Sequence, residues 1–192
     1  MNSGKITGIG WLCILSLILT GLIGHGSAWA KSKEFIKIAG EEGYDLAPYA
    51  KILDDKDNAL TFEDVSGLDM STRFHQANDQ GINFNVDDIT HWLRIEIRHI
   101  DNKNRFPIQR DWLLDIRRAQ LDIVELYIVR PAQPVQKMQS DLRMKFRDRP
   151  TINVNSVFPV STHRGEFVTL YIKIKNKNAT YIPIFLRSAP NF

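Results

Sequence analysis

Three strand-like segments constrain the fold most strongly. They span residues 91–98, 110–116 and 121–129, and each is rich in β-branched and aromatic side chains. In the first segment Leu93, Ile95 and Ile97 alternate with polar or aromatic residues. A period of two places successive side chains on opposite faces of a strand, so we expect one face of this segment to enter a core.

The same alternation returns near the C-terminus, in residues 168–175 and 181–186. Polar breaks rich in Asn, Gly and Pro separate the segments at short intervals. The sequence contains no long amphipathic helical pattern. Several short strands at this spacing predict an all-β fold, built as an antiparallel β-sandwich.

Other parts of the chain give weaker signals. Residues 35–38 are a candidate first strand, whereas residues 45–57 carry apolar side chains at helical spacing and are expected to be irregular or briefly helical. Pro183 lacks a backbone N–H and therefore predicts an edge position for the last strand.

The first thirty residues are typical of a targeting segment. Lys5 supplies a positive start, and an apolar run of about 13 residues follows from Trp11 to Ile23. That run is shorter than the ~20 residues of a membrane span. Ala28 and Ala30 form a small-x-small cleavage signal. We expect a signal peptide at residues 1–30 and one domain at residues 31–192, exported to the periplasm. An uncleaved N-terminal anchor is the alternative.

Composition argues against disulfide bonds in the exported domain and against a nucleic-acid partner. The single cysteine, Cys13, lies within the expected signal peptide, so the exported domain has no disulfide. The net charge of +3 is too balanced for the dense basic stripe of a nucleic-acid-binding protein. One local basic run spans residues 143–149. It can be a solvated loop, which is the commoner case, or an anion site.

Several motifs in this order resemble one family. Trp92-Leu93-Arg94 follows His91, and two further strand motifs come after it; an aromatic-x-x-Arg element before a proline matches residues 146–150. Together, over residues 35–186, they resemble the type 2 extracellular domain of bacterial seven-transmembrane receptors with diverse intracellular signalling modules. The resemblance implies a jelly-roll β-sandwich similar to carbohydrate-binding modules.

The resemblance also implies an architecture. In that family a signal peptide precedes the domain, and seven membrane helices and a cytoplasmic output module follow it. This sequence ends at Phe192, where the membrane region would begin. We therefore expect either a stand-alone periplasmic relative, or a fragment or split-gene product of a membrane diguanylate cyclase or histidine kinase receptor.

The sequence offers no recognisable catalytic, metal or cofactor site. His91 and His99 are eight residues apart, roughly 26 Å along an extended strand, too far to share an ion, and are expected at a surface or strand edge. Residues 54–58 are acidic but lack the order of a calcium loop. No nucleophile motif occurs, and nothing selects a pair of carboxylates for glycoside hydrolysis. We therefore predict a non-enzyme without metal or cofactor. A periplasmic carbohydrate-active enzyme is the alternative.

Candidate ligand-binding residues come from aromatic and charged side chains that share strand faces. An apolar sugar ring can stack on an aromatic side chain, and a guanidinium can bind a carboxylate or hydroxyl groups. The candidates are Trp92, Arg94, Glu96, Tyr127 and Arg147. In the competing interpretation the tryptophans fill the core, and the arginines pair with nearby acids.

The sequence thus predicts a periplasmic, ligand-binding sensory input domain. Its partner is expected to be a small molecule, with a carbohydrate as one candidate, or a membrane receptor protein, and not a nucleic acid. Association with the membrane is expected only through such a partner or through helices downstream of this sequence.

Cleavage after Ala30 is the first testable prediction. The positive start, the short apolar run and the small-residue signal predict a periplasmic protein that begins at Lys31. N-terminal sequencing of the periplasmic fraction checks this. Recovery of the protein with Met1 in the membrane fraction would contradict it.

Overall fold

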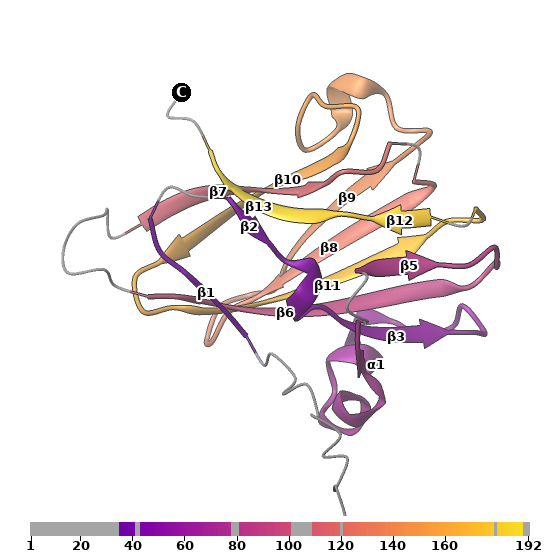
Figure 1. Ribbon diagram of the computed structural model, residues 1–192, viewed down its shortest axis with the longest axis horizontal. Coiled ribbons are helices and arrows are strands. Elements are labelled where there is room, and N and C mark those ends of the chain that lie inside the picture. Colours follow the sequence, from indigo (N-terminus) through magenta and orange to yellow (C-terminus); the bar gives the residue numbers. More distant parts are fainter. Residues whose placement is uncertain are drawn as a thin grey trace, which may run out of the picture. The chain divides into compact units, whose positions relative to one another are not determined.

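The computed structural model describes residues 35–40, 43–77, 81–100, 109–119, 121–178 and 180–189. The expected signal peptide at residues 1–30 lies outside this part of the chain. The described residues form two facing β-sheets with few helical turns (Figure 1). The predicted β-sandwich is therefore confirmed.

The larger sheet has seven strands. Six of them lie in the order β4 (His75–Gln76), β3 (Lys51–Asp55), β6 (Thr90–His99), β11 (Phe167–Lys175), β8 (Ile123–Val129) and β9 (Gln136–Asp141). All these neighbours are antiparallel. The seventh strand, β1 (Ile36–Ile38), pairs in parallel with the last residues of β6.

The smaller sheet has four strands, and every pairing in it is antiparallel. Their order is β10 (Ser156–His163), β7 (Gln109–Ile116), β13 (Ile184–Ser188) and β2 (Tyr44–Asp45). A separate pair joins β5 (Ile82–Phe84) and β12 (Thr180–Ile182). The helical elements are α1 (Phe62–Ser66) and the 3-10 turns η1 (Ala47–Tyr49), η2 (Leu68–Arg73) and η3 (Phe146–Asp148).

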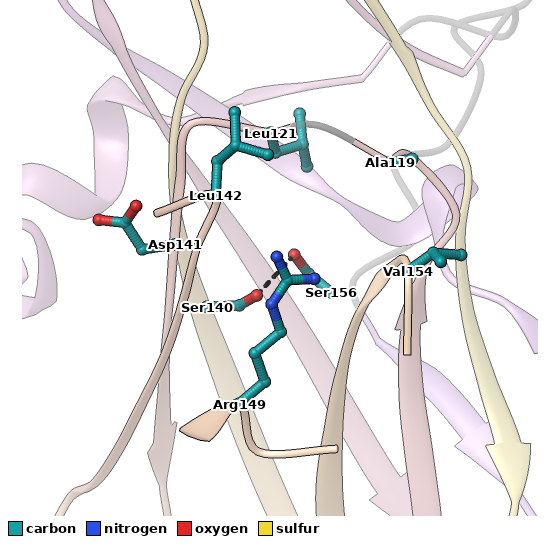
Figure 2. A pocket seen from close by; sticks show the side chains of 8 residues that line it. All are labelled: Ala119, Leu121, Ser140, Asp141, Leu142, Arg149, Val154 and Ser156. Atoms are coloured by element: carbon teal, nitrogen blue, oxygen red, sulfur yellow. Dashed lines mark hydrogen bonds between the residues drawn. The ribbon is translucent and has the colours of Figure 1, made fainter. Parts of the chain in front are cut away.

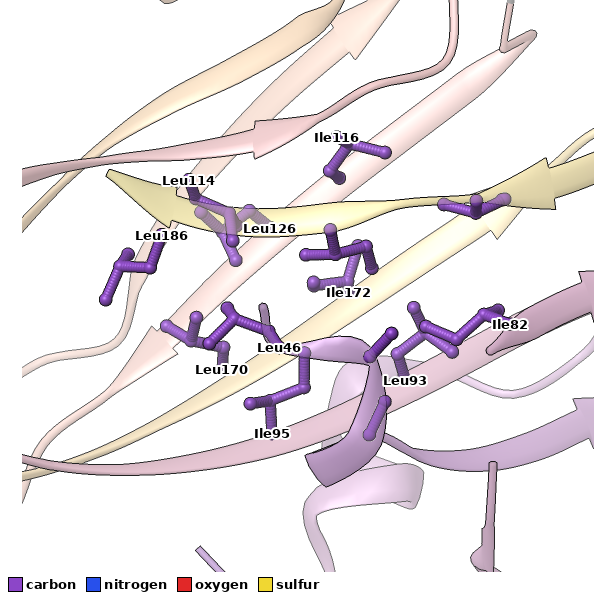
Figure 3. Close-up of a cluster of buried hydrophobic side chains, with 14 of the residues drawn as sticks. Leu46, Ile82, Leu93, Ile95, Leu114, Ile116, Leu126, Leu170, Ile172 and Leu186 are labelled. Carbon is purple, nitrogen blue, oxygen red and sulfur yellow. The ribbon is translucent and has the colours of Figure 1, made fainter. Parts of the chain in front are cut away.

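The main hydrophobic core lies between the two sheets (Figure 3). Alternate residues of β6, such as Leu93 and Ile95, meet Leu114 and Leu186 of the smaller sheet, and all four are fully buried. Burying each such side chain stabilises the fold by roughly 1.5–3 kcal/mol. The alternating pattern therefore arises as predicted, because every second side chain of these strands points into the core between the two sheets.

A short hydrogen-bonded chain joins the two sheets within this core. The indole N–H of Trp112 donates to Thr162 Oγ1 at 2.9 Å, and Thr162 Oγ1 lies 3.0 Å from His99 Nδ1. A hydroxyl that accepts from the indole can donate onward only to a neutral ring nitrogen. His99 and His91 are each 3% exposed, so the expectation that they lie at a surface or strand edge is wrong.

A second hydrophobic cluster lies on the outer face of the larger sheet. Residues 60–74 form α1 and η2, and Figure 1 shows α1 beside β3 and β6. The helix begins with a reciprocal cap between Thr61 and Asp64. The hydrogen bonds from Thr61 lower the pKa of Asp64. Apolar side chains of this segment, Val65 and Phe74 among them, cover Trp92, so β6 is buried on both faces there.

None of the helices in the described part of the chain is long and apolar enough to span a membrane.

Acid pH is predicted to weaken the fold through His99. Burial, together with the positive charges of Arg110 and Arg164, lowers the pKa of His99 below its ordinary value of 6.5. Below that pH the unfolded chain binds a proton that the folded chain excludes. Stability is therefore lost as the pH falls, by at most about 1.4 kcal/mol per pH unit.

Urea unfolding at about pH 7.5 and about pH 5.5 measures this loss. The variant His99→Gln, whose amide oxygen can still accept from Thr162, should lose less stability than the parent protein. An equal loss in both proteins, or an imidazole of His99 that titrates above 6.5 by NMR, would contradict the prediction.

Candidate functional site

The register of the larger sheet places four of the five predicted site residues on its outer face. Trp92, Arg94 and Glu96 alternate along β6, and Tyr127 lies on β8. β11 runs between these strands, and its Tyr171 is paired with both Arg94 and Tyr127. The shared face that the sequence predicted is therefore present.

Much of this face is covered by the chain itself. The ring of Phe62 in α1 stacks on Tyr127 with centroids 4.5 Å apart, and Phe74 packs edge-on against Tyr171. Trp92 is fully buried and Tyr127 is 8% exposed. Both rings thus hold the α1–η2 segment against the sheet, while Trp112 lies in the main core. This burial is what the competing interpretation of the tryptophans expected.

Several polar groups on this face have intramolecular partners, whereas the buried Trp92 Nε1 and Arg94 Nε donate no hydrogen bond within the described chain. Arg94 forms an ion pair with Glu96. Glu125 accepts a hydrogen bond from the Tyr127 hydroxyl at 2.7 Å and one from the Lys137 ammonium at 3.1 Å. Burial disfavours the Glu125 carboxylate, but these two hydrogen bonds outweigh that effect and lower the pKa of Glu125. Burial and the contact with Glu125 raise the pKa of Tyr127.

Arg147, the fifth predicted residue, belongs to a different part of the fold. It lies in η3, on the connection between β9 and β10, with its side chain 77% exposed. Its guanidinium is 3.8 Å from the carboxylate of Asp148, which is also exposed. The structure therefore does not bring Arg147 together with the other four residues. Binding by any of the five stays a prediction.

Three hollows lined by described residues lie at one end of the sandwich. They adjoin, because Leu142 lines all three and Ala119 and Asp122 each line two. Their volumes are about 290, 570 and 220 Å³. Their walls come from the β5–β6, β7–β8, β9–β10 and β11–β12 connections and the adjoining strand ends. We call this region the end groove.

The hollow of 290 Å³ is shown in Figure 2. The side chain of Arg149 extends into it, toward the hydroxyls of Ser140 and Ser156. Ser156 donates to Ser140 at 3.2 Å, and the two serines, on β9 and β10, are 5% and 7% exposed. Arg149 also donates to the backbone carbonyl of Asn153 at 3.2 Å. A guanidinium and two buried hydroxyls thus meet in one hollow.

The other two hollows mix charged, amide and apolar groups. Asp122 is half-buried and lines both. Asn176 lines the smaller one and is 4% exposed; its amide N–H donates to the carbonyl of Asn178 at 2.9 Å. That donation orients the amide, and the buried Asn176 Oδ1 accepts no hydrogen bond from any group of the described chain.

Only part of this site could be predicted from the sequence. The basic run at 143–149, considered above as a solvated loop or an anion site, contains Arg149, which lines a hollow, and Arg147, which is solvated. Nothing in the sequence pointed to Ser140, Ser156 or Asn176. They come from separate strands and turns and meet only through the strand register. In the part of the chain that is described, no three His, Cys, Asp or Glu side chains are placed to hold a metal ion.

Comparisons with known proteins add to this geometry. No curated protein sequence matches the chain. Among solved structures it is similar to the mosquito-larvicidal Cry4Aa toxin from Bacillus thuringiensis, with 10% identity and a TM-score of 0.36 over 83% of this chain and 25% of the toxin. The chain thus spans a quarter of that toxin's length.

A second similar structure is TmCBM61, solved in complex with β-1,4-galactotriose, with 9% identity and a TM-score of 0.33 over 80% of this chain and 91% of that one. At these TM-scores neither likeness bears on function. The family profile described as 7TMR-DISM extracellular 2 matches residues 47–188, which is most of the sequence. The chain therefore belongs to this family of extracellular sensory domains of bacterial seven-transmembrane receptors.

Proposed function

We propose that this extracellular domain senses a small polar molecule, which it binds in the end groove on the periplasmic side of the membrane. Family membership supports the sensory role. The groove supports the location, because ligand sites are usually concave, with apolar walls and a few convergent polar groups. It is built by connections at the end of a rigid sandwich, where binding residues are common in folds of this type.

The observation that carries the proposal is the amide oxygen of Asn176. It is buried, lines the groove and accepts no hydrogen bond within the described chain. Leaving a buried acceptor without a donor costs about 1–3 kcal/mol. A ligand that donates an N–H or O–H at this point would remove that cost.

The charges of the groove favour binding over hydrolysis. Asp141 is held by Arg143, which donates to its carboxylate at 3.2 Å, and Asp88 lies 3.9 Å from Lys175. Hydrolysis of a glycoside needs one protonated and one free carboxylate on either side of the bond. The hydrogen bonds from Arg143 lower the pKa of Asp141, so this carboxylate is not suited to the protonated role. We therefore keep the non-catalytic function and not the alternative of a carbohydrate-active enzyme.

The groove lies far from the end at which the described chain leaves the sandwich. Ala189 follows β13 and donates to the carbonyl of Asp111, near the start of β7. The groove adjoins the other end of β7, beyond Ile116. Strands β8 and β11 connect the two ends through the core. Occupancy of the groove can therefore be passed along them to a partner receptor, or to helices downstream of this sequence.

A leucine comparison tests the location of binding. A panel of amino acids, sugars and organic acids is screened by thermal shift and calorimetry on the full chain. Leu142 is 48% exposed and lines every hollow of the groove, whereas Leu68, in η2, is 90% exposed and lines none of them. Leu142→Ser should weaken binding of any hit at least about threefold, the loss of roughly 0.7 kcal/mol of apolar contact.

Leu68→Ser is the matched control, and it should leave the affinity unchanged. If every hit binds Leu142→Ser as tightly as it binds the parent protein, the end groove is not the site.

The outer face of the larger sheet is a second candidate. Arg94 Nε is buried there and donates no hydrogen bond to the described chain, so a ligand could supply the acceptor. If a sugar of the panel binds this face, Arg94→Ala should weaken its affinity by about 1–3 kcal/mol with little change in the melting temperature. Under the groove proposal the same variant leaves the affinity of every hit unchanged.

A further inference from the structure

We propose that the end of the sandwich opposite the groove binds the surface of a lipid bilayer that carries anionic headgroups. The surface involved is the basic-aromatic patch, which we define as Phe35, Lys37, Arg98 and Phe167. It lies apart from the end groove, so the inference does not depend on the proposed ligand site.

Strand register brings the four residues of the patch together. Lys37 of β1 is paired with Arg98 of β6, and Arg98 is paired with Phe167 of β11. The rings of Phe35 and Phe167 meet edge to face, with centroids 5.9 Å apart. The Arg98 guanidinium lies 4.8 Å from the centroid of Phe167, and the Lys37 ammonium lies 6.0 Å from that of Phe35. Two cations thus flank two apolar rings.

The patch is the open part of the outer face of the larger sheet. Arg98 is on the same face as Trp92, because the two are six residues apart on one strand. The α1–η2 segment covers Trp92 but none of the patch residues. Lys37 and Arg98 are exposed, and Phe167 is 46% exposed. No ion pair joins Lys37 or Arg98 to a carboxylate of the described chain, and Glu96 pairs with Arg94 instead.

The same end of the sandwich carries an excess of positive charge. It lies at the left in Figure 1, where β10 ends and β11 begins. Of its described side chains, five are basic and two are acidic: Lys37, Arg98, Arg110, Arg130 and Arg164 against Asp111 and Glu166. Arg130 and Glu166 form a largely buried ion pair, with the two atoms 3.4 Å apart. The remaining charges leave a net excess of three positive charges toward the solvent.

An anionic bilayer complements both properties of the patch. Aromatic rings settle at the level of the headgroups, and long basic side chains keep their charge in water while their stems cover apolar surface. Each Lys or Arg near an anionic lipid surface strengthens binding roughly fivefold. Extracellular domains of membrane receptors work beside a bilayer, so a domain of this family has such a surface within reach.

Other occupants fit the patch less well. A sugar stacks on a free ring face, but Arg98 already lies over Phe167, and Lys37 lies near the face of Phe35. A small anion is usually held in a concave site, whereas no residue of the patch lines any of the three hollows of the end groove. Exposed cations spread beside apolar rings suit an extended charged surface better.

Vesicle flotation tests the inference. Protein from the periplasmic fraction is mixed with vesicles of phosphatidylcholine, either alone or with an equal share of phosphatidylglycerol. The parent protein should bind the mixed vesicles at least about tenfold more tightly at low salt, because several cations face the anionic surface. About 1 M salt should remove most of this preference, since the Debye length is then only about 3 Å.

Variants of the patch should lose this binding. The double variant Lys37→Gln/Arg98→Gln removes two cations and should bind the mixed vesicles roughly 30-fold more weakly. Phe167→Ser keeps the charge but removes an apolar ring, and it should weaken binding roughly three- to tenfold. Circular dichroism checks that each variant is folded. Each variant keeps the N-terminus of the parent protein, so a difference in binding comes from the patch.

Matched controls change the same chemistry elsewhere. Lys56→Gln/Arg147→Gln also removes two exposed cations, but both lie at the groove end. Leu68→Ser removes an apolar side chain that is 90% exposed in η2. Both controls should bind the mixed vesicles like the parent protein. If Lys56→Gln/Arg147→Gln weakens binding as much as the patch variant does, overall charge and not the patch is responsible, and the inference is wrong.

Two further results would overturn the inference. One is that the parent protein binds neither kind of vesicle, or binds both equally. The other is that a sugar binds the parent protein but not Phe167→Ser, while no vesicle is bound. The proposed function is tested separately, because Leu142→Ser should bind vesicles like the parent protein and the Lys37/Arg98 variant should bind every hit of the panel like the parent protein.

Discussion

Burial of β6 on both of its faces is the constraint on which the rest of the structure depends. Its inner residues, Leu93 among them, pack in the main core, and Trp92 on the opposite face is fully buried under the α1–η2 segment. Along its edges β6 pairs with β1, β3 and β11. A strand held in this way joins two hydrophobic clusters. No cysteine occurs after Cys13, so apolar burial and hydrogen bonding do this work without a disulfide.

This constraint also limits how much of the larger sheet's outer face a ligand can reach. The aromatic residues of the larger sheet look like a binding platform in the sequence, but in the fold Phe62 stacks on Tyr127 and covers that part of the face. The main-chain groups of the sheet are engaged with one another, and its charged groups are largely paired. Under the proposed function the ligand binds at the strand ends, where connections from distant parts of the sequence approach one another. There Asn176 Oδ1 and Ser140 retain hydrogen-bonding capacity that the described chain does not use.

The sequence predicted those strands in which buried and exposed side chains alternate. The alternation around Leu93 is confirmed as β6. The prediction that residues 45–57 are irregular or briefly helical is wrong for Lys51–Asp55, which form β3. This strand is buried on both faces and therefore shows no period of two. β9 was not predicted, since as a polar edge strand it has few apolar residues. Pro183 is no edge marker: it separates β12 from β13, and β13 lies between two strands. The end groove could not be predicted, because its polar residues are brought together only by strand register.

Chemical-shift mapping tests the central claim most directly, namely that the sheet face is structural and the end groove binds the ligand. Backbone amide spectra of the protein would be recorded during titration with whichever panel compound binds. We predict shifts concentrated in residues 117–123, 140–156 and 175–178, with β6 and α1 unaffected. Shifts concentrated at Arg94, Glu96 and Tyr127 and in α1, with the groove unchanged, would contradict the account and return the site to the face of the larger sheet.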